Sequence, residues 1–142
     1  MGEKKVKGRK RHVLVDTQGY LLSVLVTPAN LSDRDGLECV LTYARPDLPR
    51  LTTVWADQSY DGEDFVAFIR DEFDVALDIV PKLADQHTFV VLPRRWVVER
   101  SLGWFGRHRR LSKDYEREPE CSETWIYLAS IHLLAKRLTK VA

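Results

Sequence analysis

The sequence Leu-Thr-Thr-Val-Trp-Ala-Asp at residues 51–57 is the segment around which the predicted architecture is organised. Its first six residues are apolar or β-prone, which is typical of a strand buried inside a sheet. Asp57 follows directly, at the carboxyl end of that strand, where open α/β sheets gather their ligands. An aspartate at that position either caps the following turn or holds a hard divalent cation.

Strand and helix patterns alternate on both sides of this strand. Strands are predicted at residues 11–16, 20–27 and 75–80, helices at 34–44, 62–71, 94–108 and 122–138, and a loop at 83–92. Gly19 is the expected positive-φ residue of the first hairpin turn. This order predicts one α/β domain over residues 1–142, with a mixed sheet: an antiparallel hairpin followed by parallel strands joined by crossovers.

The last predicted helix carries apolar residues at helical spacing. Its expected core face consists of Trp125, Leu128, Ala129, His132 and Ala135. We interpret His132 on that face as a packed side chain and not as a metal ligand.

Composition excludes several classes of protein. The chain has 142 residues, 44% of them hydrophobic, and four Trp, which predicts a folded domain and not a disordered one. No apolar run approaches the roughly 18 residues of a membrane span, and the basic N-terminus does not resemble a signal peptide. Cys39 and Cys121 make neither a metal spacing nor a disulfide framework. We therefore expect a protein of the reducing cytoplasm with no membrane partner.

The formal net charge of +1 hides a strong segregation of charge. Residues 1–12 carry six Lys/Arg and one Glu, and residues 94–117 carry eight Lys/Arg and three acids. Residues 13–93 between them carry five Lys/Arg and fourteen acids. Basic blocks attract the phosphate backbone of nucleic acids, and the second block also contains Trp and Phe. Each block by itself would also fit a solvated surface.

The second basic block surrounds one carboxylate, Glu99. The run at residues 93–110 reads Pro-Arg-Arg-Trp-Val-Val-Glu-Arg-Ser-Leu-Gly-Trp-Phe-Gly-Arg-His-Arg-Arg. Arg95 and Glu99 lie four residues apart and share a helix face. Either the run is a solvated amphipathic helix with an ordinary ion pair, or Glu99 joins Asp57 in binding a cation beside phosphates.

Two carboxylates can bind Mg²⁺, but a two-metal phosphoryl-transfer site usually needs a third. The candidates for that third ligand are Asp16, Asp33, Asp35 and Asp61. Three of them have a sufficient structural explanation without any metal, since Asp16 lies at a hairpin turn, Asp33 at a helix start and Asp61 in a second turn.

Four segments, in order along the chain, resemble the catalytic domain of bacterial insertion-sequence DDE transposases. They are VKGRKRHVLVDT at residues 6–17, VLVTPANLSDRDG at 24–36, WADQSYDG at 55–62, and RRWVVER at 94–100 followed by WFGR at 104–107 and RRLSKDYE at 109–116. Together these segments cover nearly the whole chain.

This resemblance implies a ribonuclease H-like fold, a mixed sheet flanked by helices, and a transposase that cleaves DNA and transfers strands. It implies that Asp57 and Glu99 are catalytic and bind the metal, Mg²⁺ or Mn²⁺, and that Arg95 contacts DNA or phosphate. With the other basic residues of the two blocks, the predicted DNA-binding set is Lys7, Arg9, Lys10, Arg11, Arg94, Arg95, Arg100, Arg107, Arg109 and Arg110.

The sequence departs from the family pattern at its first acid. In the family, the first catalytic Asp lies on a central strand that precedes the segment at residues 6–17, so we expect a domain truncated at its N-terminus. The family's lysine about seven residues after the Glu is not matched, because Gly106 stands at that position and Arg107 follows it. Either the hairpin pairs directly with the strand at residues 51–56, or a partner supplies the missing strand.

Three functions follow from these expectations. The first is a transposase fragment that is inactive alone and is completed by an upstream transposase polypeptide. The second is a non-catalytic DNA-binding remnant or a module that acts on an intact transposase multimer. The third is a small interaction protein in which the arginine-rich helix is only a solvated surface.

Overall fold

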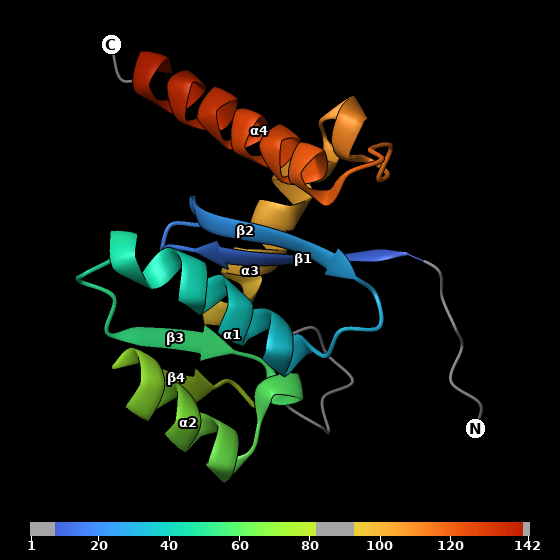
Figure 1. The fold of residues 1–142 in the computed structure, drawn as a ribbon. Coiled ribbons are helices and arrows are strands. Elements are labelled where there is room, and N and C mark those ends of the chain that lie inside the picture. The colour runs from blue at the N-terminus through green and yellow to red at the C-terminus, as the bar shows by residue number, and fades with distance from the viewer. Residues whose placement is uncertain (1–7, 82–92, 141–142) are drawn as a thin grey trace, which may run out of the picture.

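The computed structural model describes residues 8–81 and 93–140, without the side chains of residues 93–96. The expected loop at 83–92 lies outside these residues. The strands are β1 Arg9–Val15, β2 Leu21–Pro28, β3 Thr53–Ala56 and β4 Ala76–Ile79. The helices are α1 Asp33–Ala44, α2 Glu63–Phe73, α3 Pro93–Gly106 and α4 Pro119–Lys140, with short 3-10 helices η1 Arg45–Asp47, η2 Gln58–Tyr60 and η3 Arg109–Leu111 (Figure 1). Every element predicted from the sequence within these residues is present.

The hairpin of β1 and β2 is antiparallel, with Val13 opposite Val24. Its turn is organised by Asp16, whose Oδ1 accepts hydrogen bonds from the backbone N–H groups of Gln18 and Tyr20, both at 2.9 Å. Gly19 has a φ of 90°, which confirms the predicted positive-φ position.

The expected single mixed sheet is wrong for the described residues, which form two separate sheets. One sheet is the β1–β2 hairpin, and the other is the parallel pair of β3 and β4 joined by α2. The predicted direct pairing of the hairpin with the strand at residues 51–56 is also absent from them. Parallel pairing of β3 and β4 itself agrees with the predicted crossover connection.

One core nevertheless joins the two sheets. Leu14 of β1 belongs to the same buried cluster as Leu41 of α1, Val54 of β3 and Ile69 of α2. Helix α1 contacts both strands of the hairpin, and α3 contacts β1 and β3. In Figure 1, α1 crosses in front of the strands and α3 runs behind them. The two sheets are therefore held together by helices and side chains.

Helix α4 lies along the outer edge of β2. The Val24 N–H donates to the Tyr127 hydroxyl at 3.3 Å, and the Val26 N–H donates to Glu123 Oε1 at 2.8 Å. An exposed strand edge presents unpaired backbone groups, and these two side chains satisfy two of them.

The predicted core face of α4 is wrong except at Ala129. The buried residues of the helix are Ser122, Ile126, Ala129 and Ser130. His132 is exposed, with its ring edge-to-face with His108 at 5.7 Å between centroids. Helix α4 therefore buries one large apolar side chain, Ile126, together with small residues, and leaves Trp125, Leu128 and Ile131 exposed. No described helix, α4 included, is both long and apolar enough to cross a membrane.

His12 fills the space between β1 and α1. Its ring is buried, and Nε2 lies 2.8 Å from the Thr27 hydroxyl on β2. Burial lowers the pKa of His12, an effect partly opposed by the charge of Asp33, so the neutral ring is favoured in the folded protein. A Cβ atom added at Gly36 of α1 would come within 2.2 Å of this ring.

We expect Gly36→Ala to destabilise the protein by about 1–3 kcal/mol, because the added methyl group overlaps the His12 ring. Gly103→Ala is the matched control, since Gly103 is also helical and a Cβ atom there meets nothing within 4 Å. The control should leave stability unchanged or raise it by up to about 1 kcal/mol, as alanine favours helix. Urea unfolding of both variants measures the difference, and equal midpoints would contradict the predicted overlap.

Candidate functional site

Asp57 immediately follows β3 and caps η2. Its Oδ1 accepts hydrogen bonds from the Ser59 N–H at 2.8 Å and from the Ser59 hydroxyl at 2.5 Å. The capping interpretation of Asp57 is thus confirmed, and cation binding by the same side chain stays a prediction. The residue is half-buried at the carboxyl end of its strand.

The surroundings of Asp57 are rich in negative charge. Burial, and then the charges of Asp33 and Asp57, raise the pKa of Tyr60 to about 12. Asp33 in turn forms an ion pair with Lys10, with Nζ 3.0 Å from Oδ1. Helix α1, which begins at Asp33, contacts η2. Asp33 and Asp57 thus lie near the same tyrosine, and Lys10 pairs with the first of them.

Glu99 lies on α3 and is exposed. Because α3 contacts β3, the structure brings the helix that carries Glu99 against the strand that leads into Asp57. The approach of the two carboxylates to each other stays a prediction. Within the described residues, no group of three or more His, Cys, Asp or Glu side chains is placed to hold a metal ion.

The four acids considered as a third ligand have structural positions of their own. Asp16 organises the hairpin turn, Asp33 begins α1, and Asp61 ends η2. Asp35 lies in the first turn of α1, where the backbone N–H of that residue donates to the Ser32 cap at 3.1 Å. Negative charge in the first turn is favourable for the helix dipole.

The middle of α3 is anchored to the hairpin turn. Ser101 is fully buried, and its hydroxyl donates to the Gly19 carbonyl at 2.6 Å. Arg100 donates to the Gln18 carbonyl at 2.5 Å and lies over the Trp104 ring, 4.8 Å from its centroid. These contacts set the position of Glu99, their neighbour in sequence. Sequence reasoning missed Ser101, for which the only signal was a small polar residue between large ones.

The basic residues of β1 have partners inside the protein. Arg9 forms an ion pair with Asp114 at 3.1 Å and also donates to the carbonyls of Glu116 and Arg117. Lys10 binds the Leu31 carbonyl at 2.9 Å as well as Asp33, and Arg11 donates to the Leu111 carbonyl at 3.0 Å. Lys7 lies outside the described residues. These side chains fasten β1 to the connection between α3 and α4 and to the start of α1.

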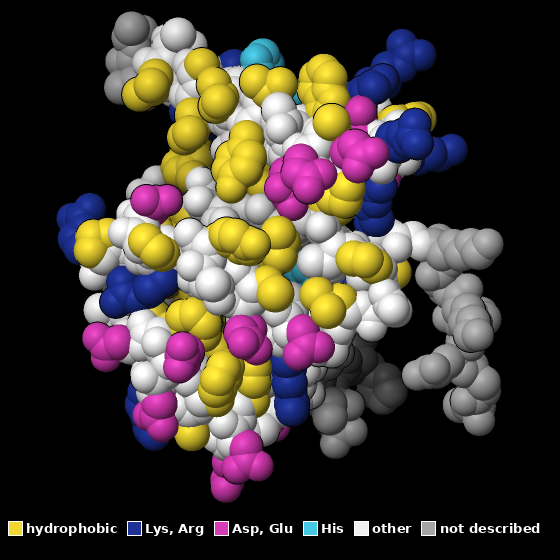
Figure 2. Space-filling model, viewed as in Figure 1, with side chains coloured by type: hydrophobic (Ala, Val, Ile, Leu, Met, Phe, Trp, Pro, Cys, Tyr) yellow, Lys and Arg dark blue, Asp and Glu magenta, His cyan; other side chains and the backbone are white. Residues whose placement is uncertain are grey.

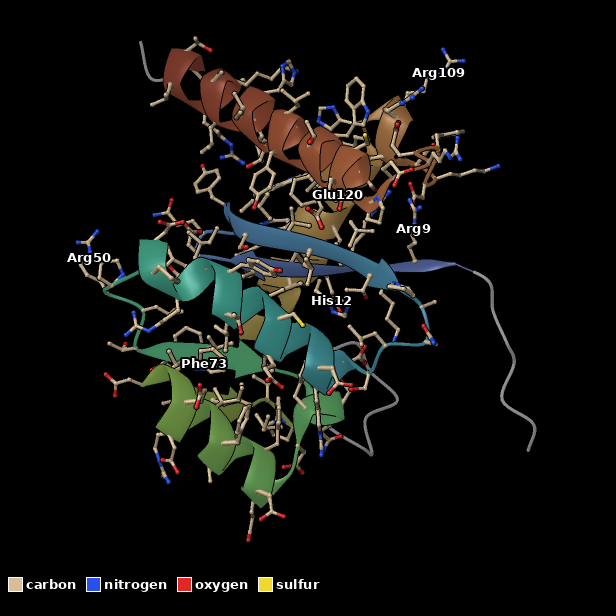
Figure 3. All side chains as sticks on the ribbon, in the orientation of Figure 1. Arg9, His12, Arg50, Phe73, Arg109 and Glu120 are labelled. Carbon is tan, nitrogen blue, oxygen red and sulfur yellow. The ribbon has the colours of Figure 1, made fainter. Side chains whose placement is uncertain are left out.

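The second basic block presents an exposed surface on the connection between α3 and α4. We call it the basic ridge; its residues are Arg107, Arg109, Arg110, Lys113 and Arg117, all exposed. Lys113 and Arg117 were not among the predicted DNA-binding residues. Figure 2 shows Lys and Arg side chains gathered beside one end of α4, on the side where Figure 3 labels Arg109.

Aromatic rings accompany the ridge. The Arg110 guanidinium lies 5.9 Å from the centroid of Tyr115 and 5.5 Å from that of Trp125, and its Nε pairs with Glu116 at 2.7 Å. Exposed cations beside exposed rings are the combination with which proteins bind single-stranded or distorted nucleic acids. Arg94 and Arg95 begin α3, but the positions of their side chains are outside the described part of the chain.

Comparisons with known proteins agree on one family. The family model described as "Transposase DDE domain" matches residues 2–134. A relative from Burkholderia cepacia, described as "Putative transposase for insertion sequence element IS402", is 29% identical over 128 residues. That match covers 85% of this chain and 60% of the relative, so the chain spans less than two thirds of the relative's length. No solved structure matches significantly.

We expect Arg9→Ala to loosen the segment that carries the basic ridge, because three acceptors at residues 114–117 lose their common donor. Arg9→Lys should loosen it nearly as much, since an ammonium group lacks the forked guanidinium geometry. Lost bonds of this kind correspond to about 1–2 kcal/mol of local stability, or roughly tenfold faster cleavage by trypsin after Lys113. Arg50→Ala is the control, because Arg50 lies far from this segment (Figure 3). Unchanged cleavage in both Arg9 variants would show that the bonds from Arg9 to residues 114–117 do not stabilise this segment.

Proposed function

Since this chain belongs to the transposase DDE domain family, we propose that it supplies the metal-binding and DNA-binding parts of a DNA transposition catalyst. The observation that carries the proposal is the contact of α3 with β3, which brings the helix of Glu99 against the strand that ends at Asp57. The reaction class is metal-dependent cleavage of a DNA strand followed by strand transfer.

Asp57 and Glu99 are the proposed metal ligands. Their carboxylate oxygens suit Mg²⁺ or Mn²⁺, which prefer hard oxygen ligands. A bound ion would supply Lewis-acid stabilisation of the charge that develops on phosphate oxygens. Ser59 holds Asp57 in place, while Ser101 and Arg100 hold the middle of α3, so both acids are positioned by contacts outside the metal site.

We propose that a further strand supplies the third carboxylate and completes a ribonuclease H-like sheet between β1 and β3. The N–H groups of Val24 and Val26 point towards α4, so their register partners Val13 and Arg11 present backbone groups on the far edge of β1. Beside β4, the Thr52 carbonyl accepts a hydrogen bond from the Ala76 N–H, and the Ala56 carbonyl accepts one from the Val80 N–H. The backbone N–H and C=O groups of Thr53 in β3 therefore point to the opposite edge. An upstream transposase polypeptide would provide this strand, and the chain by itself is proposed to be inactive.

DNA is the proposed partner of the basic ridge. The ridge combines five exposed cations with Tyr115 and Trp125, while the basic side chains of β1 are occupied in holding the segment beneath it. Phosphate binding by such a surface releases counterions and depends steeply on salt. A non-catalytic DNA-binding role is the second candidate, and the same ridge would support it.

We expect Asp57→Asn and Glu99→Gln each to weaken Mn²⁺ binding by about tenfold or more, because each removes a charged ligand. Asparagine can still accept the bond from Ser59, so the cap of η2 is retained. Titration calorimetry with Mn²⁺ measures the change, and Glu72→Gln, an exposed acid on α2, is the control.

Nicking of supercoiled DNA in the same buffers separates the two candidate functions. Mn²⁺ binding that is lost in both variants, with no nicking by the chain alone, supports the proposal of an incomplete catalyst. Nicking that both variants abolish would contradict the proposed inactivity of the chain alone. Unaltered Mn²⁺ binding in both variants would contradict the proposed metal site and would leave the non-catalytic DNA-binding role as the remaining candidate.

We expect the double substitution Arg107→Ala and Arg109→Ala to weaken DNA binding and to reduce the slope of log affinity against log salt by about 2, roughly one unit for each phosphate that is no longer neutralised. Arg50→Ala with Arg70→Ala removes the same charge from exposed positions away from the ridge and should leave the slope unchanged. Fluorescence anisotropy at several salt concentrations gives both slopes. If both double variants weakened DNA binding equally, the effect would come from net charge, and the proposed role of the basic ridge would be contradicted.

A further inference from the structure

The turn between β3 and α2 is a compact hydrogen-bonded unit with Asp57 at one end and Asp61 at the other. The Tyr60 N–H donates to the Asp57 carbonyl at 3.2 Å, and the Asp61 N–H donates to the Gln58 carbonyl at 3.1 Å. The Asp57 side chain closes the unit by accepting the Ser59 N–H. Because these bonds couple the residues of the turn, a shift at the Asp61 end is transmitted to Asp57.

Arg34 of α1 contacts the Asp61 end of this turn. Its guanidinium group donates a hydrogen bond to the Asp61 carbonyl and lies 5.5 Å from the centroid of the Phe65 ring on α2. A Cβ atom added at Gly62, between them, would come within 2.9 Å of the Arg34 Nη2 atom. Figure 1 shows the start of α1 beside the segment that joins β3 to α2.

These contacts require the shape of a guanidinium group and not only its positive charge. A planar guanidinium can donate to a carbonyl from its edge and lie with its face on an aromatic ring, whereas an ammonium group is a compact charge. One exposed hydrogen bond would hold a turn weakly. The Asp61 carbonyl and the Phe65 ring together fix the group from two elements, η2 with its cap and α2.

The first turn of α1, from which Arg34 extends, is itself held in place. The Ser32 hydroxyl caps the helix by accepting the Asp35 N–H at 3.1 Å. Lys10 of β1 pairs with Asp33, with 3.0 Å between Nζ and Oδ1. Arg34 therefore links a part of α1 that is fixed to the hairpin with the turn that follows β3.

We propose that Arg34 is a positioning residue, which holds the turn between β3 and α2 against α1 and thereby sets the position of Asp57. This inference rests on the proposed function, in which Asp57 binds the metal. Arg34 itself is assigned no contact with metal or DNA. Its effect passes through the backbone of Asp61, which lies four positions after Asp57.

Substitution of Arg34 separates positioning from charge, because the two predict opposite changes in Mn²⁺ binding. Arg34→Met removes a positive charge near the turn of Asp57, which by Coulomb repulsion alone would make Mn²⁺ bind more tightly. If Arg34 positions Asp57, the same variant should instead weaken Mn²⁺ binding by about tenfold. Arg34→Lys keeps the charge without the guanidinium group and should weaken binding by roughly threefold.

Titration calorimetry of the full chain with Mn²⁺ measures these changes, with Arg50→Met as the control. Arg50 is also exposed and precedes the amino end of β3, whereas Asp57 follows the carboxyl end, so the control should bind Mn²⁺ normally. Thermal melts check that the variants fold, which the exposure of Arg34 leads us to expect. Unchanged or tighter binding by Arg34→Met, where the wild type binds the ion, would overturn the positioning role.

Amide hydrogen exchange without metal distinguishes a failure of this inference from a failure of the proposed function. Arg34→Met should speed exchange of the Tyr60 and Asp61 N–H groups by about tenfold, because the turn that they close is released, and should leave the amides of α4 unchanged. A wild-type chain that bound no Mn²⁺ would contradict the metal site, while faster exchange at these two amides would still support the role of Arg34 in holding the turn. Unchanged exchange would overturn that role, whatever the metal titration shows.

Discussion

Hydrogen bonding along the edges of two small sheets governs how the elements of this protein are arranged. A two-stranded sheet has an open edge on each side, and unpaired backbone groups there are costly when they are shielded from water. At the outer edge of β2, two backbone N–H groups donate hydrogen bonds to side chains of α4, Tyr127 and Glu123. Towards β3, the protein holds the hairpin with α1, α3 and a shared core. This arrangement explains why α4 lies where it does and why space for a strand is proposed between β1 and β3.

The arginines fall into two groups, according to whether carbonyls of the protein accept hydrogen bonds from their side chains. Arg9 and Arg11 on β1 donate hydrogen bonds to backbone carbonyls of residues 111–117, so they hold the connection between α3 and α4 against β1. Arg107 and Arg109 on that connection are exposed. Basic residues that look alike in the sequence therefore have different physical roles, because the first group is held by acceptors of the protein and the second faces solvent.

The two halves of helix α4 differ in their surroundings. Its first half is fixed against β2 and lies beside the basic ridge, while most residues of its second half are exposed. The second half still contacts the protein, because the Arg137 guanidinium lies 5.4 Å from the centroid of the Trp104 ring on α3.

Local sequence was enough to predict the order and type of the elements, the turn at Gly19 and the capping position of Asp57. These depend on neighbouring residues alone: the period of apolar side chains, the φ of glycine and the geometry of a carboxylate beside the next N–H groups. The family resemblance was also readable, because its motifs are short and lie in order. The partners of Arg9, the anchoring of α3 by Ser101, the outward-facing side of α4 and the division of the strands into two sheets emerged only in three dimensions. Each depends on groups some twenty to a hundred residues apart in the chain, and periodicity states which residues share a face but not what that face will meet.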